Sequence, residues 1–491
     1  MKSKVSKVLS ILLSVVLVTS SFYLLYQVIR LNVLPTKFLF PLTIGVVVLD
    51  AIFILLLIYF SKNVVSKIIC IVLTLFICVA TCMGGYYISK TQHVLSNITN
   101  VAKHAKNTVS VVVKESSSIQ NKSQLNGVSV GSLRLNEQGS KKVLKELSGE
   151  GIALNQSEYD SMTALLEAFY NGEVDSIIIN ESSRSQILDM EAYSNFDLNT
   201  RVVYQTSYKV KNNDSATSVS DITSKPFNVL ISGSDTRGGF DENGRSDVIM
   251  IATVNPKTQT ILLTSVPRDF YVTTACDAGD GCMQGALDKI THTGIHGTNT
   301  TKRTVEQLLG IEINYTFKVG FDTVTKLVDV LGGVDVYVEP GYEFHNSDLS
   351  VNEGKNHLYG EEALNYARER YAYTEGDRQR TKNQQQVLMG IVKEATKPSV
   401  ITNYAAIMDT MANTFSTTMS NEEITDLIKY QLNNNPTWKM EQYMVDGTGD
   451  TLMCAELGDA ASVMVPDQST VKMAKDKINA VLAGKSSEDV K

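Results

Sequence analysis

The chain has 491 residues and a formal net charge of −7, with 20% charged and 43% hydrophobic residues. This length exceeds what a single hydrophobic core usually serves, so we expect two or more domains. The mildly acidic composition, without a large basic block, gives no electrostatic basis for binding nucleic acid.

Three apolar stretches near the N-terminus predict membrane-spanning helices, at about Val8–Ile29, Phe38–Phe60 and Ile68–Tyr87. Each has roughly the 20 apolar residues that a helix needs to cross a bilayer. The first stretch is too long for a cleaved signal peptide, lacks a small-residue cleavage site and is followed by two more spans, so we interpret it as an uncleaved anchor. Asp50 within the second stretch is expected to be protonated or to face another helix, because an unpaired carboxylate is costly in lipid.

The distribution of cations predicts the orientation of these helices. Five lysines lie before the first span or between the second and third, against two cations in the remaining loop: Lys2, Lys4, Lys7, Lys62 and Lys67, against Arg30 and Lys37. Positive charge favours the cytoplasmic side, so we expect a multi-pass protein of the cell membrane whose chain beyond Lys90 is extracytoplasmic. Cys276 and Cys282 bracket a short glycine-containing loop, and outside the cytoplasm such a pair predicts a disulfide.

Residues 91–210 alternate between helical and strand patterns, which predicts a small accessory α/β domain after the membrane anchor of residues 1–90. The expected strands are Ser110–Val113, Val174–Ile179 and Arg201–Val210, and the expected helices are Glu137–Leu147 and Glu158–Tyr170. A polar stretch over residues 211–225 has the composition of a linker.

A second domain is predicted over residues 226–484. Its strands and helices alternate, which is typical of an α/β fold, here an α-β-α sandwich around a central mixed sheet. The expected strands are Phe227–Ser232, Val248–Val254, Gln259–Ser265 and Val334–Val338. The expected helices are Thr300–Leu309, Phe321–Leu331, Glu361–Ala367, Arg378–Ala395, Glu422–Gln431 and Thr470–Leu482. The polar tail, residues 485–491, is expected to be disordered.

Acidic and basic side chains gather where the first strands of this domain end. Asp235 and Arg237 follow the first strand, Arg245 and Asp247 precede the second, and Arg268 follows the third. Phosphate chemistry uses positive charge at the oxygens and often a divalent cation held by carboxylates, and hard oxygen ligands such as these suit Mg²⁺. The alternative is that the aspartates cap turns.

A second polar group lies farther along the chain. Asp377, Arg380 and Gln384 share one face of a helix that begins near Asp377, so a guanidinium and an amide can present donors side by side. This arrangement suits a pyrophosphate, although Asp377 also fits the role of helix N-cap. Arg368 and Arg370 precede this helix.

The second domain resembles the catalytic domain of LytR-CpsA-Psr proteins over about half of the chain, and with three spans and an accessory domain it is most similar to the streptococcal capsule-type CpsA branch. Each matching motif is weak alone, and their order makes the set specific. The motifs are Ser234-Asp235-Thr236-Arg237, Arg245-Ser246-Asp247, Val266-Pro267-Arg268-Asp269, Leu287-Asp288-Lys289-Ile290, Gly332-Gly333-Val334-Asp335, Ala363–Arg370, and Gly376-Asp377 with Arg380 and Gln384.

The resemblance implies a Mg²⁺-dependent phosphotransferase, with Mn²⁺ as the alternative cation. The enzyme would move a glycopolymer phosphate, capsular or teichoic-acid-like, from an undecaprenyl pyrophosphate carrier to peptidoglycan, and no nucleic acid would take part. Asp235 and Asp247 match the metal ligands and, with Arg268, the catalytic residues. The pyrophosphate-binding set is matched by Arg245, Arg268, Arg368, Arg370, Arg380 and Gln384.

Some roles stay open at the level of the sequence. The stretch Gly376–Arg380 departs from the family pattern, in which relatives often carry glycine before the arginine, so either Arg378 or Arg380 could reach phosphate. The four-residue spacing to Gln384 favours Arg380. A general base is not evident, and Asp269 is a candidate by adjacency alone. His292 and His296 are interpreted as part of a loop rather than as a zinc pair, because Gly294 separates them and no glutamate follows the first histidine.

Three other functions are alternatives to a transferase. A transcription regulator is disfavoured because three spans separate the domain from DNA and no helix-turn-helix pattern is present. A hydrolase of the pyrophosphate lipid would use the same residues with water as acceptor, and a non-catalytic polyprenyl phosphate binder would use the arginines alone. The sequence does not separate these two from a transferase.

Overall fold

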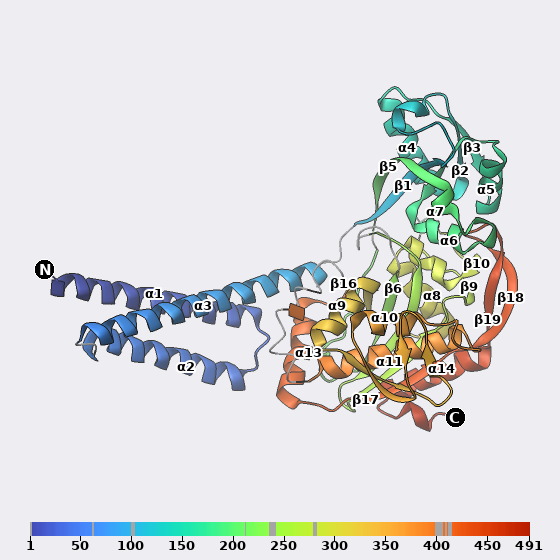
Figure 1. Ribbon diagram of the computed structural model, residues 1–491. Coiled ribbons are helices and arrows are strands. Elements are labelled where there is room, and N and C mark those ends of the chain that lie inside the picture. The colour runs from blue at the N-terminus through green and yellow to red at the C-terminus, as the bar shows by residue number, and fades with distance from the viewer. Residues whose placement is uncertain are drawn as a thin grey trace. The chain divides into compact units, whose positions relative to one another are not determined.

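The structure is a computed structural model that describes residues 2–60, 63–99, 104–211, 213–234, 242–277, 282–397, 406, 407, 410 and 415–491. The chain divides into two compact units. The first unit contains residues 1–99, 394–412 and 420–437, and the second contains residues 100–393, 413–419 and 438–491. Figure 1 shows the helices and strands of both units.

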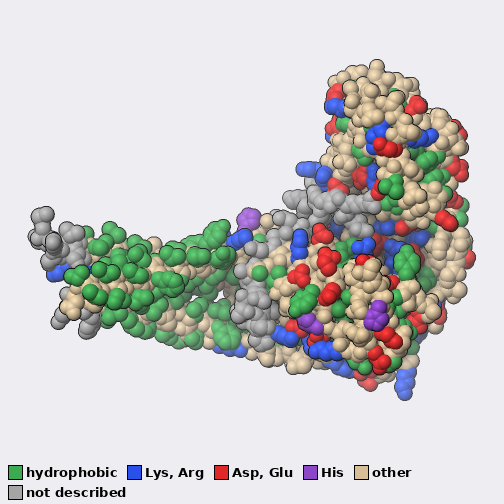
Figure 2. Space-filling model, in the orientation of Figure 1, with side chains coloured by type: hydrophobic (Ala, Val, Ile, Leu, Met, Phe, Trp, Pro, Cys, Tyr) green, Lys and Arg blue, Asp and Glu red, His purple; other side chains and the backbone are tan. Residues whose placement is uncertain are grey.

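Three long helices make up most of the first unit. They are α1 (Lys2–Leu31), α2 (Thr36–Leu55), which continues as a π-helical turn over Leu56–Phe60, and α3 (Val64–Thr99). All three are long and apolar enough to cross a membrane, and apolar side chains dominate their visible surface in Figure 2. Ser21 of α1 donates a 2.9 Å hydrogen bond to Asp50 of α2, so Asp50 faces another helix, as predicted.

Helix α13 (Asn421–Asn434) belongs to the same unit although it lies more than 300 residues farther along the sequence. It is hydrogen-bonded to the connection after α1 and to the first turn of α2. Lys429 donates to the side chain of Asn32 at 2.9 Å, and Lys37 donates to the carbonyl of Asn433 at 2.7 Å. The segment that carries α13, expected within the second domain, is therefore packed with the membrane helices.

The accessory domain contains a five-stranded sheet of order β3-β2-β4-β1-β5. Its strands are β1 (His104–Lys114), β2 (Ser129–Leu133), β3 (Asn155–Tyr159), β4 (Ser176–Asn180) and β5 (Thr200–Lys211). Separate apolar clusters pack α4 (Glu137–Gly149) and α5 (Met162–Asn171) against it. Two short helices follow, α6 (Arg184–Asp189) and α7 (Phe196–Asn199).

The expected helix over Glu158–Tyr170 begins later than predicted. Residues through Tyr159 pair with β2 as strand β3, and α5 begins at Met162. The side chain of Ser161 accepts a hydrogen bond from the backbone N–H of Ala164 and so caps the helix. The local N-cap and the available strand partner outweigh the helical pattern of the residues before Ser161.

The second domain is built on a six-stranded sheet of order β16-β11-β6-β7-β8-β17. Pairs β11–β6 and β8–β17 are parallel and the other pairs are antiparallel, so the predicted mixed sheet is confirmed. The strands are β6 (Phe227–Ser234), β7 (Ser246–Asn255), β8 (Thr260–Val266), β11 (Tyr315–Gly320), β16 (Phe415–Thr417) and β17 (Lys439–Met444).

One apolar core holds helices to this sheet, and a second core joins helices to short strands outside it. In the first, α8 (Thr298–Leu309) and α14 (Gln468–Leu482) bury Val305 and Ile478 against Leu230, Ile251 and Leu262. In the second core, α9 (Phe321–Leu331), α10 (Gly360–Arg368) and α11 (Asp377–Ala395) pack with β12 (Val334–Val338) and β15 (Gly354–Leu358). Figure 1 shows α10 and α11 in front of the sheet.

Short strand pairs complete the described part of the fold. The remaining strands are β9 (Tyr271–Thr273), β10 (Leu287–Lys289), β13 (Phe344–His345), β14 (Ser350–Val351), β18 (Gly447–Cys454) and β19 (Asp459–Pro466). The polar tail, expected to be disordered, forms a 3₁₀ turn over Ser487–Asp489 instead. The backbone N–H of Ser487 donates to the buried carboxylate of Glu441 at 2.8 Å, which explains the order.

Candidate functional site

The register of β7 and β8 brings Asp247 and Arg268 together. The strands are antiparallel with Ile249 opposite Val266, so Asp247, two residues before Ile249, is level with Arg268, two residues after Val266. Arg268 Nη1 lies 2.8 Å from Asp247 Oδ1, and their side chains are 15% and 11% exposed. A charge-assisted hydrogen bond of this kind is stronger than one between neutral groups.

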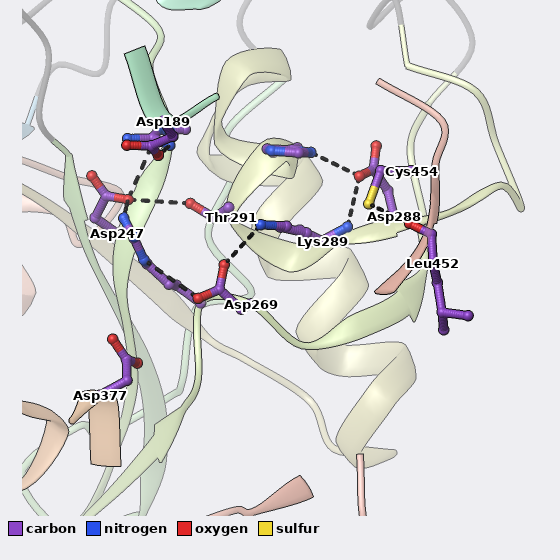
Figure 3. Close-up of polar contacts among 12 residues, drawn as sticks. Asp189, Asp247, Asp269, Asp288, Lys289, Thr291, Asp377, Leu452 and Cys454 are labelled. Atoms are coloured by element: carbon purple, nitrogen blue, oxygen red, sulfur yellow. Dashed lines mark hydrogen bonds and ion pairs between the residues drawn. The ribbon is translucent and has the colours of Figure 1, made fainter. Parts of the chain in front are cut away.

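A short helix supports Asp247 from the side. Residues Ile290–His296 form a 3₁₀ helix rather than the expected loop, and Thr291 lies 3.4 Å from Asp247 Oδ1 as a hydroxyl donor (Figure 3). Gly294 lets this helix approach β7, because a Cβ at this position would lie 2.5 Å from the carbonyl oxygen of Gly244 and 2.6 Å from the nitrogen of Ser246. Any larger residue at 294 would push the helix away from Asp247.

Arg245 immediately precedes β7 and is buried, with a side chain 9% exposed. Its Nη1 donates to a carboxylate oxygen of Asp189, the last residue of α6 in the accessory domain. Its Nε lies 4.0 Å from Asp247 Oδ1. Arg245, Asp247 and Arg268 therefore form one chain of charges that continues into the accessory domain at Asp189.

The N-terminus of α11 adds a further arginine. Arg380 forms an ion pair with Asp377, one turn earlier in the helix, and its side chain is 12% exposed. Arg378 points elsewhere, because its guanidinium lies 2.8 Å from Asp446 and its side chain is 46% exposed. Arg380 is close enough to Arg268 and Asp247 for their charges to affect its pKa.

The remaining predicted residues lie at different depths. Arg370 is close enough to Arg380 to disfavour its charge, and it donates to the hydroxyl of Tyr371 at 2.6 Å. The guanidinium of Arg368 lies over the ring of Phe321, and no described contact joins it to the other arginines. The side-chain amide of Gln384 donates to the carbonyl of Ala367 at 3.3 Å.

The electrostatic balance differs between the two central arginines. Burial disfavours the charge of Arg268, but the carboxylates of Asp247 and Asp269 outweigh burial and raise its pKa. Burial also disfavours the charge of Arg380, and with Arg268 and Arg370 nearby its pKa is lowered despite Asp377. Arg268 is thus compensated within the protein, whereas Arg380 carries a charge that the described residues do not fully offset.

Three buried guanidinium nitrogens lack a hydrogen-bond acceptor among the described residues: Nε of Arg245, of Arg268 and of Arg380. The hydroxyl of Ser234, at the end of β6, is in the same condition. Buried donors without acceptors are costly, and such groups in a native structure call for an explanation. An oxygen-rich anion bound at this cluster would supply the missing acceptors.

The residues are compatible in part with the expected magnesium site. Asp247 has the hard carboxylate oxygens that Mg²⁺ prefers, and it lies beside the arginines where substrate phosphate oxygens would complete the coordination. The other expected ligand, Asp235, directly follows Ser234 in the sequence and lies outside the described residues, as does Arg237. Within the described ranges there is no group of three or more side chains arranged to hold a metal ion.

Two of the motif residues hold the fold around the site. Asp288 is buried, lies 2.7 Å from Nδ1 of His292 and accepts a 2.7 Å hydrogen bond from the backbone N–H of Glu456. Asp269, the candidate base, lies 3.3 Å from Lys289 as an ion pair (Figure 3). Asp269 also lies 3.8 Å from Nε of Arg268, so it helps to locate that guanidinium.

The predicted cysteine pair is joined in the structure. Cys276 and Cys282 form a disulfide with their Cα atoms 6.4 Å apart. Arg303 of α8 forms an ion pair with Asp277 inside this small ring. The disulfide thus closes a small ring within the connection between β9 and β10, and β10 carries Lys289.

Sequence reasoning did not find Asp189 or Thr291. Asp189 lies in the accessory domain, and an ion pair across domains leaves no local signal in the sequence. Thr291 follows the Leu287–Ile290 motif directly, and its proximity to the site depends on the 3₁₀ turn that the sequence did not predict.

Taken together, the fold and the site define an α/β protein with buried arginines gathered beside the strand ends of a mixed sheet, and with three long apolar helices. Comparison with protein families matches residues 193–480, more than half of the chain, to the LytR_cpsA_psr family. The chain therefore belongs to the LytR-CpsA-Psr family, which confirms the resemblance drawn from its motifs.

Curated relatives carry the name polyisoprenyl-teichoic acid–peptidoglycan teichoic acid transferase TagU. The protein from Bacillus licheniformis is 32% identical over 226 residues, which cover 46% of this chain and 70% of the relative. The protein from Bacillus subtilis is 33% identical over 226 residues, with the same coverage. These names refer to teichoic acid, so the capsule-type branch stays a prediction.

Solved structures of similar proteins each match about half of this chain. Crystallised Bacillus subtilis TagU is 29% identical, with a TM-score of 0.41, and the match covers 52% of this chain and 97% of that one. A Streptococcus agalactiae protein is 25% identical, with a TM-score of 0.46, and the match covers 53% of this chain and 89% of that one.

Proposed function

We propose that this protein transfers a glycopolymer phosphate from an undecaprenyl pyrophosphate carrier to peptidoglycan. The observation that carries the proposal is the set of three buried arginine Nε donors without acceptors in the described structure, around the Asp247–Arg268 pair. A diphosphate offers several anionic oxygens to such donors. The names of the relatives support a polyisoprenyl-linked donor and a peptidoglycan acceptor.

The reaction would be an in-line displacement at phosphorus. An acceptor hydroxyl attacks the glycan-bearing phosphorus, the bond to the bridging oxygen breaks, and the lipid phosphate leaves with the electron pair while the hydroxyl proton passes to solvent. Arg268 and Arg380 would offset the charge that develops on the phosphate oxygens. Mg²⁺ or Mn²⁺ held by Asp247 and Asp235 would supply further charge neutralisation.

The class of glycopolymer and the cellular location form part of the proposal. Teichoic-acid-type polymer is favoured by the names of the relatives, and capsular polysaccharide is the alternative. The arginine site would be extracytoplasmic, which is supported by the cation bias around the apolar helices and by the Cys276–Cys282 disulfide.

The test uses the full-length protein in detergent with a radiolabelled lipid-linked glycan and peptidoglycan, in Mg²⁺ or in a chelator. Label that moves to peptidoglycan only in the presence of the cation supports the proposal. Label released to water with or without peptidoglycan identifies a hydrolase instead. Lipid that binds without any turnover identifies a carrier-binding protein. Parallel reactions with teichoic-acid and capsular donors decide the polymer class.

A further inference from the structure

The accessory domain contributes a carboxylate to the arginine cluster. Asp189 ends α6, and a carboxylate oxygen accepts a hydrogen bond from Nη1 of Arg245. Figure 3 shows Asp189 above Asp247 at the edge of the cluster. Asp189 is also close enough to Arg268 to contribute to the raised pKa of that guanidinium. One aspartate of the accessory domain thus interacts with two of the arginines proposed to bind phosphate.

Helix α6 is anchored so that Asp189 has a defined position. Arg184 at its start is buried and binds the carboxylate of Glu181 through Nε at 2.6 Å and Nη2 at 2.8 Å. Its Nη1 donates to Asp197 at 2.9 Å. Ile187 of the same helix is fully buried in the accessory core. A bidentate arginine pair and a buried aliphatic side chain together fix so short a helix.

The Asp189–Arg245 pair is one of several contacts between the accessory and catalytic domains. The backbone N–H of Met162 in α5 donates to the carbonyl of Leu457 at 2.9 Å. Lys106 of β1 lies 3.2 Å from the buried carboxylate of Glu242. These contacts lie within one compact unit, so the accessory domain holds Asp189 at Arg245.

Arg245 depends on this contact for its orientation. Among the described residues, its side chain donates one hydrogen bond, to Asp189. Asp247 lies 4.0 Å from its Nε. The flexible side chain of an arginine loses conformational entropy when it is ordered, and a fixed partner reduces what remains to be lost on binding a ligand. With Nη1 held by Asp189, Nε stays free of described acceptors and available to an anion.

We propose that Asp189 is a positioning residue that orients Arg245 toward the diphosphate, so that the accessory domain completes the anion site. This inference rests on the proposed function. Asp189 also carries a negative charge that would repel a phosphate, but its side chain is 55% exposed, so water and salt screen that charge, whereas Arg245 is buried. Orientation of the buried arginine therefore outweighs repulsion from the exposed carboxylate.

The test is a double-mutant cycle on full-length protein in detergent, with inorganic pyrophosphate and undecaprenyl pyrophosphate as calorimetric ligands. Asp189→Asn should weaken binding of both ligands by about two- to fivefold, the range set by partly exposed ion pairs. Asp189→Glu should recover most of the loss. Glu191→Gln removes an exposed charge two residues away and should leave affinity unchanged. In an Arg245→Gln background, Asp189→Asn should have no further effect, because its action passes through Arg245.

The outcomes separate the two proposals. If the wild-type protein binds pyrophosphate and Asp189→Asn binds it equally well or more tightly, the positioning role is wrong, and tighter binding would mean that Asp189 opposes the ligand. An undiminished effect of Asp189→Asn in the Arg245→Gln background would also overturn it. If the wild-type protein binds neither ligand, the proposed function fails first, and the inference with it. Unchanged melting temperatures of the variants are required for the expected result to count in its favour.

Discussion

Replacing Arg380 by glutamine should separate ligand binding from folding. Arg380 is buried, its Nε has no described acceptor, and burial together with Arg268 and Arg370 lowers its pKa. The charge of Arg380 therefore does not stabilise the folded protein in the absence of a ligand. A bound diphosphate would turn the same charge into a favourable contact.

The magnitude follows from the exposure of the side chain. A charge-assisted hydrogen bond at a site that is 12% exposed contributes about 1.5–3 kcal/mol, so Arg380→Gln should weaken binding of the pyrophosphate lipid by about 10- to 150-fold. Asp377, left without its partner, is 28% exposed and lies in the first turn of α11, where a negative charge is favourable. We therefore expect the free energy of unfolding to stay the same or to rise by about 1 kcal/mol.

Arg378→Gln provides the matched control on the same helix. Its guanidinium is 46% exposed and pairs with Asp446, so its loss should change lipid affinity by about fivefold at most. Calorimetric titration of full-length protein measures the affinities, and thermal unfolding measures stability. The assignment would be refuted if Arg380→Gln bound the lipid as well as the wild type does. It would also be refuted if Arg378→Gln bound the lipid more weakly than Arg380→Gln does. A large loss of stability in Arg380→Gln would refute the argument from uncompensated charge.

Three further predictions concern the metal, the disulfide and pH. Asp247→Asn should raise the activation free energy by several kcal/mol, so the rate of cation-dependent transfer should fall on the order of 10²-fold or more. The rate should then depend little on the Mg²⁺ concentration, and a normal Mg²⁺ titration would contradict the ligand role. Replacing Cys276 and Cys282 by serine should cost about 2 kcal/mol of unfolding free energy, measured by denaturant titration under non-reducing conditions, and an equal loss in the wild type on adding reductant is the control. The buried carboxylate of Glu441 is penalised by desolvation, but hydrogen bonds from Lys439 and the C-terminal turn lower its pKa to about 2. Its stabilisation is therefore fully present above the unfolded value of about 4.3 and is lost as pH falls toward 2, so Glu441→Gln should remove part of the acid sensitivity of unfolding, and an unchanged pH profile would argue against this pairing.

The sequence predicted most of the elements of the second domain because its patterns are local. The apolar periodicity of Phe321–Leu331 matches α9 to the residue, and the run Val334–Val338 matches β12. The three-residue spacing of Asp377 and Arg380 places them one turn apart on a helix, as the structure shows. For Asp247 and Arg268, the sequence predicted only that both lie at strand ends. Their pairing depends on the register of β7 and β8, which is set by contacts along the whole strands.

Features that depend on distant partners were not accessible in the same way. Asp189 contacts Arg245 from another domain, and no periodicity in either segment encodes that contact. The order of Ser487 depends on the buried carboxylate of Glu441, which lies 46 residues earlier. Arg368 matches the family motif by position, but its stacking on Phe321 depends on how α9 and α10 pack.

The division of the chain into compact units has a practical consequence for making a soluble version of this protein. Removing residues 1–99 would not remove a self-contained unit, because the chain returns to that unit twice, through residues 394–412 and 420–437. Helix α13 would lose the hydrogen bond between Asn421 and Thr99, at 2.7 Å, and those from Lys429 to Asn32 and from Lys37 to Asn433. A truncated protein would therefore retain α13 without these hydrogen-bond partners. Aggregation or altered lipid affinity of that protein would then be a consequence of the deletion and not a property of the intact enzyme.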